Sequence, residues 1–467
     1  MTTSDLRPDP PSDGGVSRRT LLTRSASAGV GIVLSGSIPG LFGTALAAPG
    51  GGVGYGPLVP DPAGLLSLPE GFSYTLVAQS GVTLLESGQP TPDDPDGTAA
   101  FVRHGGDGSV LVNNHEIGGG EAFRVPALPG LTYDPRAGGG TTTIEVDKDG
   151  NRVREYVSLA GTHNNCAGGR TPWDTWLTCE ETEGSPAGSN IRHGYVFEVD
   201  PYDQNANRDP TPIKALGRYA HESVAVDPQN HTIYLTEDAG NPNGLLYRWT
   251  PPSGALPLQK GALKALAPDA GALDAMKASI GGAFVPDLSV FTQPGTTLDV
   301  EWLTVPDRDA TTLSTRKQFA QITRSRKLEG MWWGDHGAYF VASFARTGDG
   351  SAAQHDGQVW FIDPAADTIE LKIWFAYTPG DQDNHPDGPD NITVSPFGGV
   401  ILAEDGDGAS HLVGATDAGE TYFFARNEIA GQSEFTGPTF SNNRTILFAN
   451  VQSPGHVFAI QGPFRKQ

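Results

Sequence analysis

The sequence consists of short strand-like runs separated by turn residues, and parts of it repeat. Residues 224–238 (VAVDPQNHTIYLTED) match residues 392–405 (ITVSPFGGVILAED), and residues 440–450 form a looser third copy. A second unit, residues 194–201 (GYVFEVDP), matches residues 357–364 (GQVWFIDP). Strand–turn–strand units that recur without a strict period are typical of the radial repetition of a β-propeller. A β-sandwich array is the alternative.

Glycine and proline strengthen this interpretation. The chain has 61 glycines and 37 prolines in 467 residues, about a fifth, where an eighth is usual. Glycine and proline at this frequency interrupt long helices and favour short strands joined by turns. Only residues 263–280, rich in alanine and leucine, predict a helical insertion. The expected fold is all-β: a single β-propeller of about six blades with one short helical insertion.

The first 47 residues are predicted to be a Tat signal peptide. Arg18 and Arg19 precede a weakly apolar stretch that ends in a small-x-small cleavage site, residues 45–47. Glycine, serine and proline interrupt this stretch too often for a transmembrane anchor. A linker (48–60) and one domain (61–467) follow. We expect a chain that engages the Tat export machinery, has no stable membrane anchor, and is secreted, periplasmic or held in the cell envelope.

The chain is strongly acidic, with a formal net charge of −23. A surface of this charge repels phosphate backbones and anionic lipids, so a nucleic-acid partner is disfavoured. The same charge attracts cations. Acidic side chains recur where predicted strands begin or end: Glu116, Glu181, Glu222, Asp238, Glu329 and Glu404.

In a propeller, equivalent strand ends converge on the central channel. Carboxylates gathered there repel one another unless cations neutralise them. Oxygen-rich clusters suit Ca²⁺, Mg²⁺ or Mn²⁺, and a thiolate added to carboxylates also suits iron. A solvated loop acid is the alternative for any single position, but recurrence at equivalent positions favours a metal cluster.

The only two cysteines, Cys166 and Cys179, lie in one segment that is also rich in glycine and tryptophan. The pattern is consistent with two alternatives, a disulfide between these cysteines or a thiolate that binds a metal.

Signatures of a side-chain nucleophile, such as Gly-x-Ser-x-Gly, are absent from the sequence. Residues 381–391 superficially resemble a calcium loop, but their prolines and the missing terminal glutamate argue against an EF-hand. Hydrolysis at such a site would depend on bound metal.

Several segments, in order along the chain, resemble the PhoX family of exported alkaline phosphatases. The most specific is residues 165–181 (NCAGGRTPWDTWLTCEE), and the others are residues 218–223 (RYAHES), 327–330 (KLEG), 389–391 (PDN), 434–440 (EFTGPTF) and 451–455 (VQSPG). The resemblance implies a β-propeller whose channel holds iron and calcium ions and hydrolyses phosphate monoesters at alkaline pH.

By position, Cys166 resembles the iron-ligating thiolate of the family, and Glu222 resembles a bridging or iron-ligating carboxylate. Glu181 and Glu329 resemble further carboxylates of the cluster, and the repeats add Glu116, Asp238 and Glu404. Lys327 stands where family members place an arginine against the substrate phosphate, so it supplies the charge without the bidentate fork. Asp174 and Ser453 also depart from the commoner glycine and histidine.

The function expected is therefore a metal-dependent phosphatase acting on small phosphate esters. Two alternatives belong to other classes. A calcium-dependent propeller lactonase or esterase would need only one or two carboxylates with asparagine, and Cys166 would be dispensable. A non-catalytic propeller that binds a partner would use its metals for structure alone.

Overall fold

The computed structural model describes residues 53–431 and 433–467, and in them the chain is all-β, as predicted. Apart from strands, this part holds only short 3-10 helices, and no helix in it is long and apolar enough to cross a membrane. The predicted signal peptide and residues 48–52 of the linker lie outside the described residues. The 3-10 helices are η1 (Gln204–Asn207), η2 (Lys214–Leu216), η3 (Leu263–Ala265), η4 (Leu288–Val290), η5 (Thr315–Lys317), η6 (Thr347–Asp349) and η7 (Gln382–Asn384).

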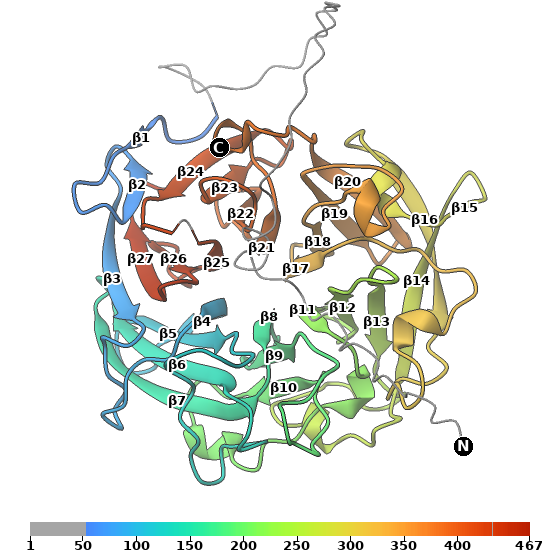
Figure 1. Cartoon of the computed structure of the whole chain (residues 1–467), viewed down its shortest axis with the longest axis horizontal. Coiled ribbons are helices and arrows are strands. Elements are labelled where there is room, and N and C mark those ends of the chain that lie inside the picture. Colours follow the sequence, from blue (N-terminus) through green and yellow to red (C-terminus); the bar gives the residue numbers. More distant parts are fainter. Residues whose placement is uncertain (1–52, 432) are drawn as a thin grey trace, which may run out of the picture. The chain divides into compact units, whose positions relative to one another are not determined.

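Five antiparallel sheets are arranged radially about a common centre, which gives the described part a propeller-like fold (Figure 1). The first contains β4 (Pro95–Val102), β5 (Gly108–His115), β6 (Gly139–Asp147) and β7 (Arg152–Thr162). The second contains β8 (Asn165–Arg170), β9 (Trp176–Glu180) and β10 (Val196–Val199). The third contains β11 (His221–Val226), β12 (Ile233–Glu237), β13 (Leu246–Thr250), β14 (Ala272–Ile280), β15 (Ala283–Val285), β16 (Thr297–Thr304), β17 (Leu328–Trp333), β18 (Ala338–Ala342), β19 (Gly357–Asp363) and β20 (Thr368–Phe375).

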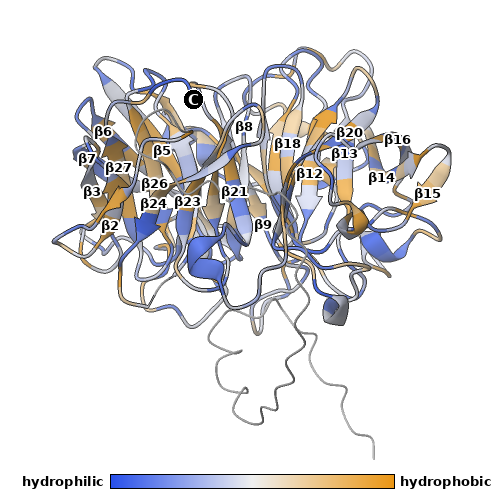
Figure 2. Cartoon of the chain, turned by 90° about the horizontal axis from the view of Figure 1, so that it is seen from above, coloured by the Kyte–Doolittle hydropathy of each residue, from blue (hydrophilic) through white to orange (hydrophobic). Residues whose placement is uncertain are grey.

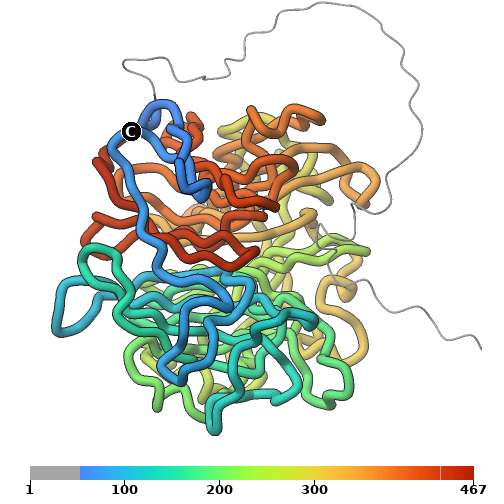
Figure 3. Tube along the Cα trace, turned by 60° about the vertical axis from the view of Figure 1, so that its left-hand side comes forward, coloured from blue at the N-terminus to red at the C-terminus, as the bar shows by residue number. Residues whose placement is uncertain are grey.

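The two remaining sheets combine strands from both ends of the described chain. One contains β1 (Leu58–Val59), β2 (Leu66–Pro69), β21 (Pro389–Val394), β22 (Val400–Glu404), β23 (His411–Ala415) and β24 (Thr421–Asn427). The other contains β3 (Ser73–Gln79), β25 (Phe435–Phe440), β26 (Ile446–Val451) and β27 (His456–Gln461). β3 pairs with β27 and β2 pairs with β24, so early strands lie beside late ones (Figure 3). This pairing closes the ring of sheets and covers strand edges that would otherwise be exposed.

The sheets do not correspond one to one with six blades. β11–β14 and β17–β20 are each a four-stranded antiparallel meander, but β16 pairs with both β14 and β20 and joins the two into one ten-stranded sheet. Hydrophobic residues concentrate in the strands of all sheets (Figure 2). Trp176, Trp249 and Trp360 are completely or almost completely buried between them.

The predicted helical insertion at residues 263–280 is wrong. Only η3 is helical there, and the second half of the segment is strand β14. Pro268 and Gly271 separate the two, since proline removes a backbone donor and glycine weakens a helix. β14 pairs with β13 and β16 and buries Leu273 and Ala275. Strand pairing and burial therefore override the helical propensity of alanine.

Candidate metal centre

Six strands line the centre of the ring: β4, β8, β11, β17, β21 and β25 (Figure 1). Each pairs with the next strand of its own meander, and all six pairs share one register. The aligned residues are Pro95 with His115, Asn165 with Glu180, His221 with Glu237, Leu328 with Ala342, Pro389 with Glu404, and Phe435 with Val451. In five pairs a β-bulge follows the alignment directly, and in the sixth it begins one residue later, after Thr436. A bulge bends the strand and re-aims a side chain.

Three positions in each pair are therefore equivalent. The lead position precedes the aligned residue of the inner strand, the bulge position follows it, and the exit position follows the aligned residue of the second strand. Lead positions hold Asp94, Asn164, Ala220, Lys327, Gly388 and Glu434. Bulge positions hold Asp96, Cys166, Glu222, Glu329, Asp390 and Thr436. Exit positions hold Glu116, Glu181, Asp238, Ser343, Asp405 and Gln452.

Backbone geometry supports this equivalence. In five of the pairs the amide of the exit residue donates to the carbonyl of the lead residue, over 2.7 to 3.2 Å. Four lead residues have a left-handed backbone, with φ of 46° at Asp94, 56° at Asn164, 47° at Lys327 and 52° at Gly388. Glycine adopts this conformation without cost, whereas Lys327 is strained in it. A strained residue at a functional centre is held there by its surroundings.

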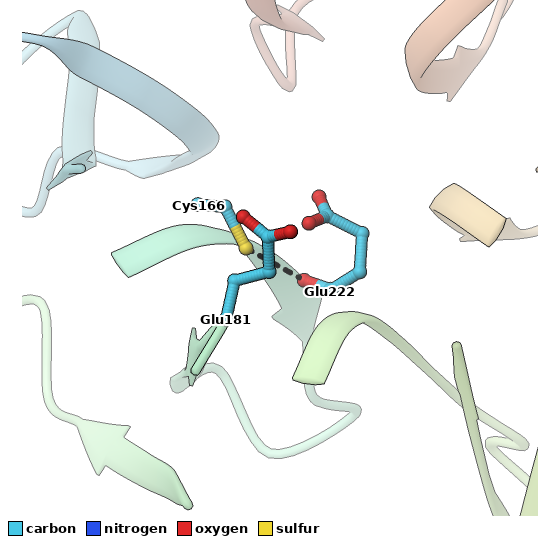
Figure 4. Close-up of side chains that lie close together, drawn as sticks. All are labelled: Cys166, Glu181 and Glu222. Atoms are coloured by element: carbon cyan, nitrogen blue, oxygen red, sulfur yellow. Dashed lines mark hydrogen bonds between the residues drawn. The ribbon is translucent and has the colours of Figure 1, made fainter. Parts of the chain in front are cut away.

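Three groups of side chains at these positions bring ligand atoms within 4.8 Å of one another. The first is Cys166, Glu181 and Glu222, whose side chains point toward one another (Figure 4). Glu222 and Asp390 each belong to two groups, so the three groups form one continuous cluster. The second group is Glu222, Glu329 and Asp390, and the third is Asp390, Asp405 and Glu434.

Crowding and burial together raise the pKa values of several residues of the cluster. Burial raises the pKa of Cys166 well above its usual value, and the Glu222 and Glu181 carboxylates raise it further. Burial also raises the pKa of Glu222, as do its neighbours Glu329 and Glu181. The pKa of Asp390 rises to about 7, mainly through burial and against the opposing charge of Lys327. So many acids cannot all be ionised at neutral pH unless cations accompany them.

Polar and cationic side chains border the cluster. The Lys327 ammonium lies 2.9 Å from the Glu329 carboxylate and 3.6 Å from that of Asp405. On the opposite strand pairs, the Gln452 amide donates to Glu116 (2.7 Å) and to Asp96 (3.2 Å). The second oxygen of Asp96, Oδ1, is buried and has no hydrogen-bond partner among the described residues. That oxygen is suited to coordinating a cation.

The structure brings most of the sequence-predicted site residues together. Cys166, Glu181, Glu222 and Glu329 belong to the cluster itself. Glu116 lies at its edge, where burial and Asp94 raise its pKa to about 7. Of the other two predicted metal ligands, Asp238 pairs with Arg326 at 3.1 Å, while its charge also acts on Glu181 and Glu329. Glu404 contacts His411 at 2.9 Å.

Glu404 illustrates a rule for the acid pairs. In Glu180-Glu181, Glu237-Asp238 and Glu404-Asp405 the first acid accepts a hydrogen bond from a backbone N–H at or just before the following strand, from Gly194, Leu245 and His411 respectively. The second acid occupies the exit position. Side chains alternate along a strand, so only one acid of each pair faces the centre. Asp405, not Glu404, belongs to the cluster.

Sequence reasoning did not select Asp96, Asp390, Asp405 or Glu434. Pro95-Asp96 and Pro389-Asp390 are proline–aspartate pairs at the first residue of an inner strand, where proline is tolerated because its missing N–H is not needed. This was an available signal. Asp405 could have been found by analogy with Glu181, the second acid of its pair.

Cys166 and Cys179 are both free thiols, so the possible disulfide between them is not formed. Both are buried, but in different surroundings. Cys179 packs in the apolar core with Val196, Val224 and Tyr247.

The segment that superficially resembles a calcium loop, residues 381–391, contributes one residue to the cluster, Asp390 at its end. Within the same segment, Asp383 accepts a hydrogen bond from the backbone amide of Ala409.

The fold and the centre together define a class: a propeller-like all-β protein with an acidic centre that includes one thiol and has the residue types to hold metal ions. The chain belongs to the alkaline phosphatase PhoX family, whose sequence profile matches residues 53–455. The predicted enzyme class, an alkaline phosphatase-like phosphoric monoester hydrolase, is thereby confirmed. No curated protein sequence matches the chain.

One solved structure supports the fold, and a second is less similar. Pseudomonas fluorescens PhoX, in complex with the transition-state analogue vanadate, has a TM-score of 0.62 at 18% identity, over 85% of this chain and 96% of that one. XC5397, a gluconolactonase from Xanthomonas campestris, has a TM-score of 0.42 at 14% identity, over 88% and 99% of the two chains. The latter likeness is too weak to carry an argument about function.

Proposed function

We propose that the chain is an exported phosphatase that hydrolyses phosphate monoesters at a cluster of iron and calcium ions held by the side chains of the central ring. The single observation that carries this proposal is the continuous cluster of Cys166 and six carboxylates, brought together from strand pairs that are far apart in the sequence. Family membership supports the reaction class.

The donor set fits the metals proposed. One group contains a thiol, and a thiolate with carboxylates suits iron. The group of Asp390, Asp405 and Glu434 offers only oxygen, which calcium prefers. The raised pKa values and the orphaned oxygen of Asp96 both fit a centre that cations complete. When bound, the metals would neutralise the charge on the phosphate oxygens and activate water.

Lys327 is proposed to bind the phosphate of the substrate. Its lead-position neighbours around the ring carry no positive charge, and its own ammonium lies beside Glu329 and Asp405. An ammonium binds an oxyanion as a point charge, whereas arginine would bind it bidentately. Lys327 would thus hold the substrate phosphate at one side of a ring that is otherwise mostly acidic.

We also propose that the fold has six blades. An inner strand that pairs with the next strand and then carries a β-bulge recurs six times, and the exit-residue hydrogen bond recurs at five of these pairs. This favours counting the ten-stranded sheet as two blades joined by β16. Residues 61–467 would then form one phosphatase domain.

Export is proposed from Arg18 and Arg19 ahead of the apolar stretch. Replacing both by lysine is expected to leave the chain uncleaved in the cytoplasm of an export-competent host, while the unaltered chain is cleaved near residue 47 and exported. Fractionation followed by amino-terminal sequencing of the exported protein distinguishes the two. Export of the double variant at the normal level would contradict a twin-arginine signal.

The activity is tested by purifying the exported chain and measuring its iron and calcium content together with hydrolysis of a chromogenic phosphate monoester. Cys166→Ala is expected to lower the iron content at least about ten-fold, because it removes the one soft ligand. Cys179→Ala is the matched control: it deletes an equally buried thiol of the apolar core, so it should reduce stability by about 1 kcal/mol and leave the iron content unchanged.

Three outcomes would contradict the proposal. Equal iron loss in both cysteine variants would make Cys166 a structural residue. Iron-free protein that hydrolyses lactones would favour the lactonase alternative. Metal-loaded protein that is inert toward every ester would favour a binding module.

A further inference from the structure

Ser343 interrupts the ring of acids. It occupies the exit position of the β17–β18 pair, where four of the other five pairs carry an acid and the fifth carries Gln452. The equivalence is not only one of register. The Ser343 amide donates to the carbonyl of Lys327 at 2.8 Å, as the Glu181 amide does to Asn164 at 2.9 Å. Glu181 and Asp405, at the same position of two other pairs, belong to the cluster, so we place Ser343 at its edge.

The Ser343 hydroxyl is unsatisfied. The residue is 0% exposed, and its Oγ has no hydrogen-bond partner among the described residues. Buried hydroxyls nearly always have a hydrogen-bond partner, because burying a hydroxyl without one costs free energy. Asp96 Oδ1 is another buried atom of the ring without a hydrogen-bond partner. An ionised carboxylate oxygen has no proton to donate, so it is suited to binding a cation rather than an anion. A hydroxyl also carries a proton that it can donate to an anion.

The charges around Ser343 favour the binding of an anion beside it. Lys327, at the lead position of the same strand pair, is the one lead residue with a positive charge. Every other strand pair carries at least one acid at its exit or lead position, which repels an oxyanion. The β17–β18 pair alone offers a cation and a neutral donor on adjacent strands, although its own bulge residue, Glu329, is acidic.

We propose that Ser343 donates a hydrogen bond through its Oγ to a phosphate oxygen of the substrate, beside the ammonium of Lys327. This inference deepens the proposed phosphatase function and rests on it. Ser343 thereby fixes the side of the ring at which the phosphate lies, and the lead and exit positions of one strand pair together form the phosphate-binding edge.

The test compares the affinity for inorganic phosphate of the metal-loaded wild type and of four variants by equilibrium dialysis, with metal content measured on each sample. Ser343→Ala is expected to raise the Kd about ten-fold or more, which is the loss of one hydrogen bond to a charged group, with metal content unchanged. Ser343→Thr keeps the hydroxyl and should bind as the wild type does. Lys327→Ala should also weaken binding and serves as the reference for a lost anion contact.

Ser158→Ala is the matched control. Ser158 is buried on the outer strand β7, where its hydroxyl contacts Thr141, so its loss should leave the phosphate affinity unchanged. An unchanged Kd in Ser343→Ala would overturn the inference. A fall in metal content would overturn it as well, since Ser343 would then be a metal ligand. A wild-type chain that neither binds phosphate nor hydrolyses esters would instead contradict the proposed function itself, before any variant is compared.

Discussion

Glu222→Gln is expected to reduce hydrolysis of phosphate monoesters by about a thousand-fold or more. Glu222 belongs to both the thiol-containing group and the adjoining all-carboxylate group, so its carboxylate joins the two parts of the cluster. Its replacement by a neutral amide removes a charge that both groups need to hold their ions. Metal charge is worth several kcal/mol of transition-state stabilisation, and each 1.4 kcal/mol is a factor of ten in rate. The measurement is kcat/KM with a chromogenic substrate, alongside the metal content.

The same substitution is expected to leave the metal-free chain at least as stable as the wild type. Burial and the neighbouring Glu329 carboxylate already disfavour a charge on Glu222, so a neutral amide relieves repulsion. Glu155→Gln is the matched control, because Glu155 is equally buried but pairs with Arg152 on the outer strand β7. It should lower the melting temperature and preserve the turnover of folded protein. Full activity in Glu222→Gln, or equal inactivation in both variants, would contradict the proposed centre.

Chelation of the metals is expected to make the stability of the chain fall steeply as the pH rises from about 4 to about 7. Burial raises the folded-state pKa of Glu116 from 4.5 to about 7, and that of Asp390 from 3.8 to about 7. A group whose folded-state pKa is raised contributes its stability below the unfolded pKa and loses it as the pH rises through the folded pKa. The loss for Glu116 alone is on the order of 3 kcal/mol.

Bound metal reverses this dependence. Cations hold the carboxylates ionised in the folded state, so the loaded chain keeps its stability at high pH and loses it as the acids take up protons at low pH. Calorimetric melting temperatures at pH 5, 7 and 9, with a chelator and with added calcium and iron, test this directly. Glu237, whose pKa is also raised to about 7 by burial, contributes in both conditions, so the difference between the two curves is the quantity to compare. Parallel curves would contradict a metal-binding cluster.

The sequence predicted the strands and the acidic positions more accurately than the side-chain directions. Runs such as residues 392–405 were recognisable because β-branched residues and turn residues alternate in them. The choice between Glu404 and Asp405 depends on register, however, and a shift of one residue turns every side chain to the other face. Register is set by pairing with β21 and by the bulge after Pro389, neither of which can be read from one strand alone.

The error at residues 263–280 has a related cause. Alanine and leucine favour a helix locally, but the partners β13 and β16 that make this segment a strand lie outside the segment itself. The cluster could be anticipated because acids recur at equivalent points of a repeat. The orphaned hydroxyl of Ser343 could not, because serine at a strand end is an ordinary turn residue until its burial is known.

The pairing of β3 with β27 has a consequence for biosynthesis. The sheet that carries Glu434 and Gln452 next to the centre is completed by a strand from the other end of the described chain. A nascent polypeptide that has emerged only as far as β24 therefore has Cys166 and Glu222 but lacks Glu434 and the finished ring. The last residue of the cluster is Glu434, but the sheet beside it is complete only when β27 has been made. We therefore expect the finished centre, and with it metal acquisition, to form after translation has passed residue 461.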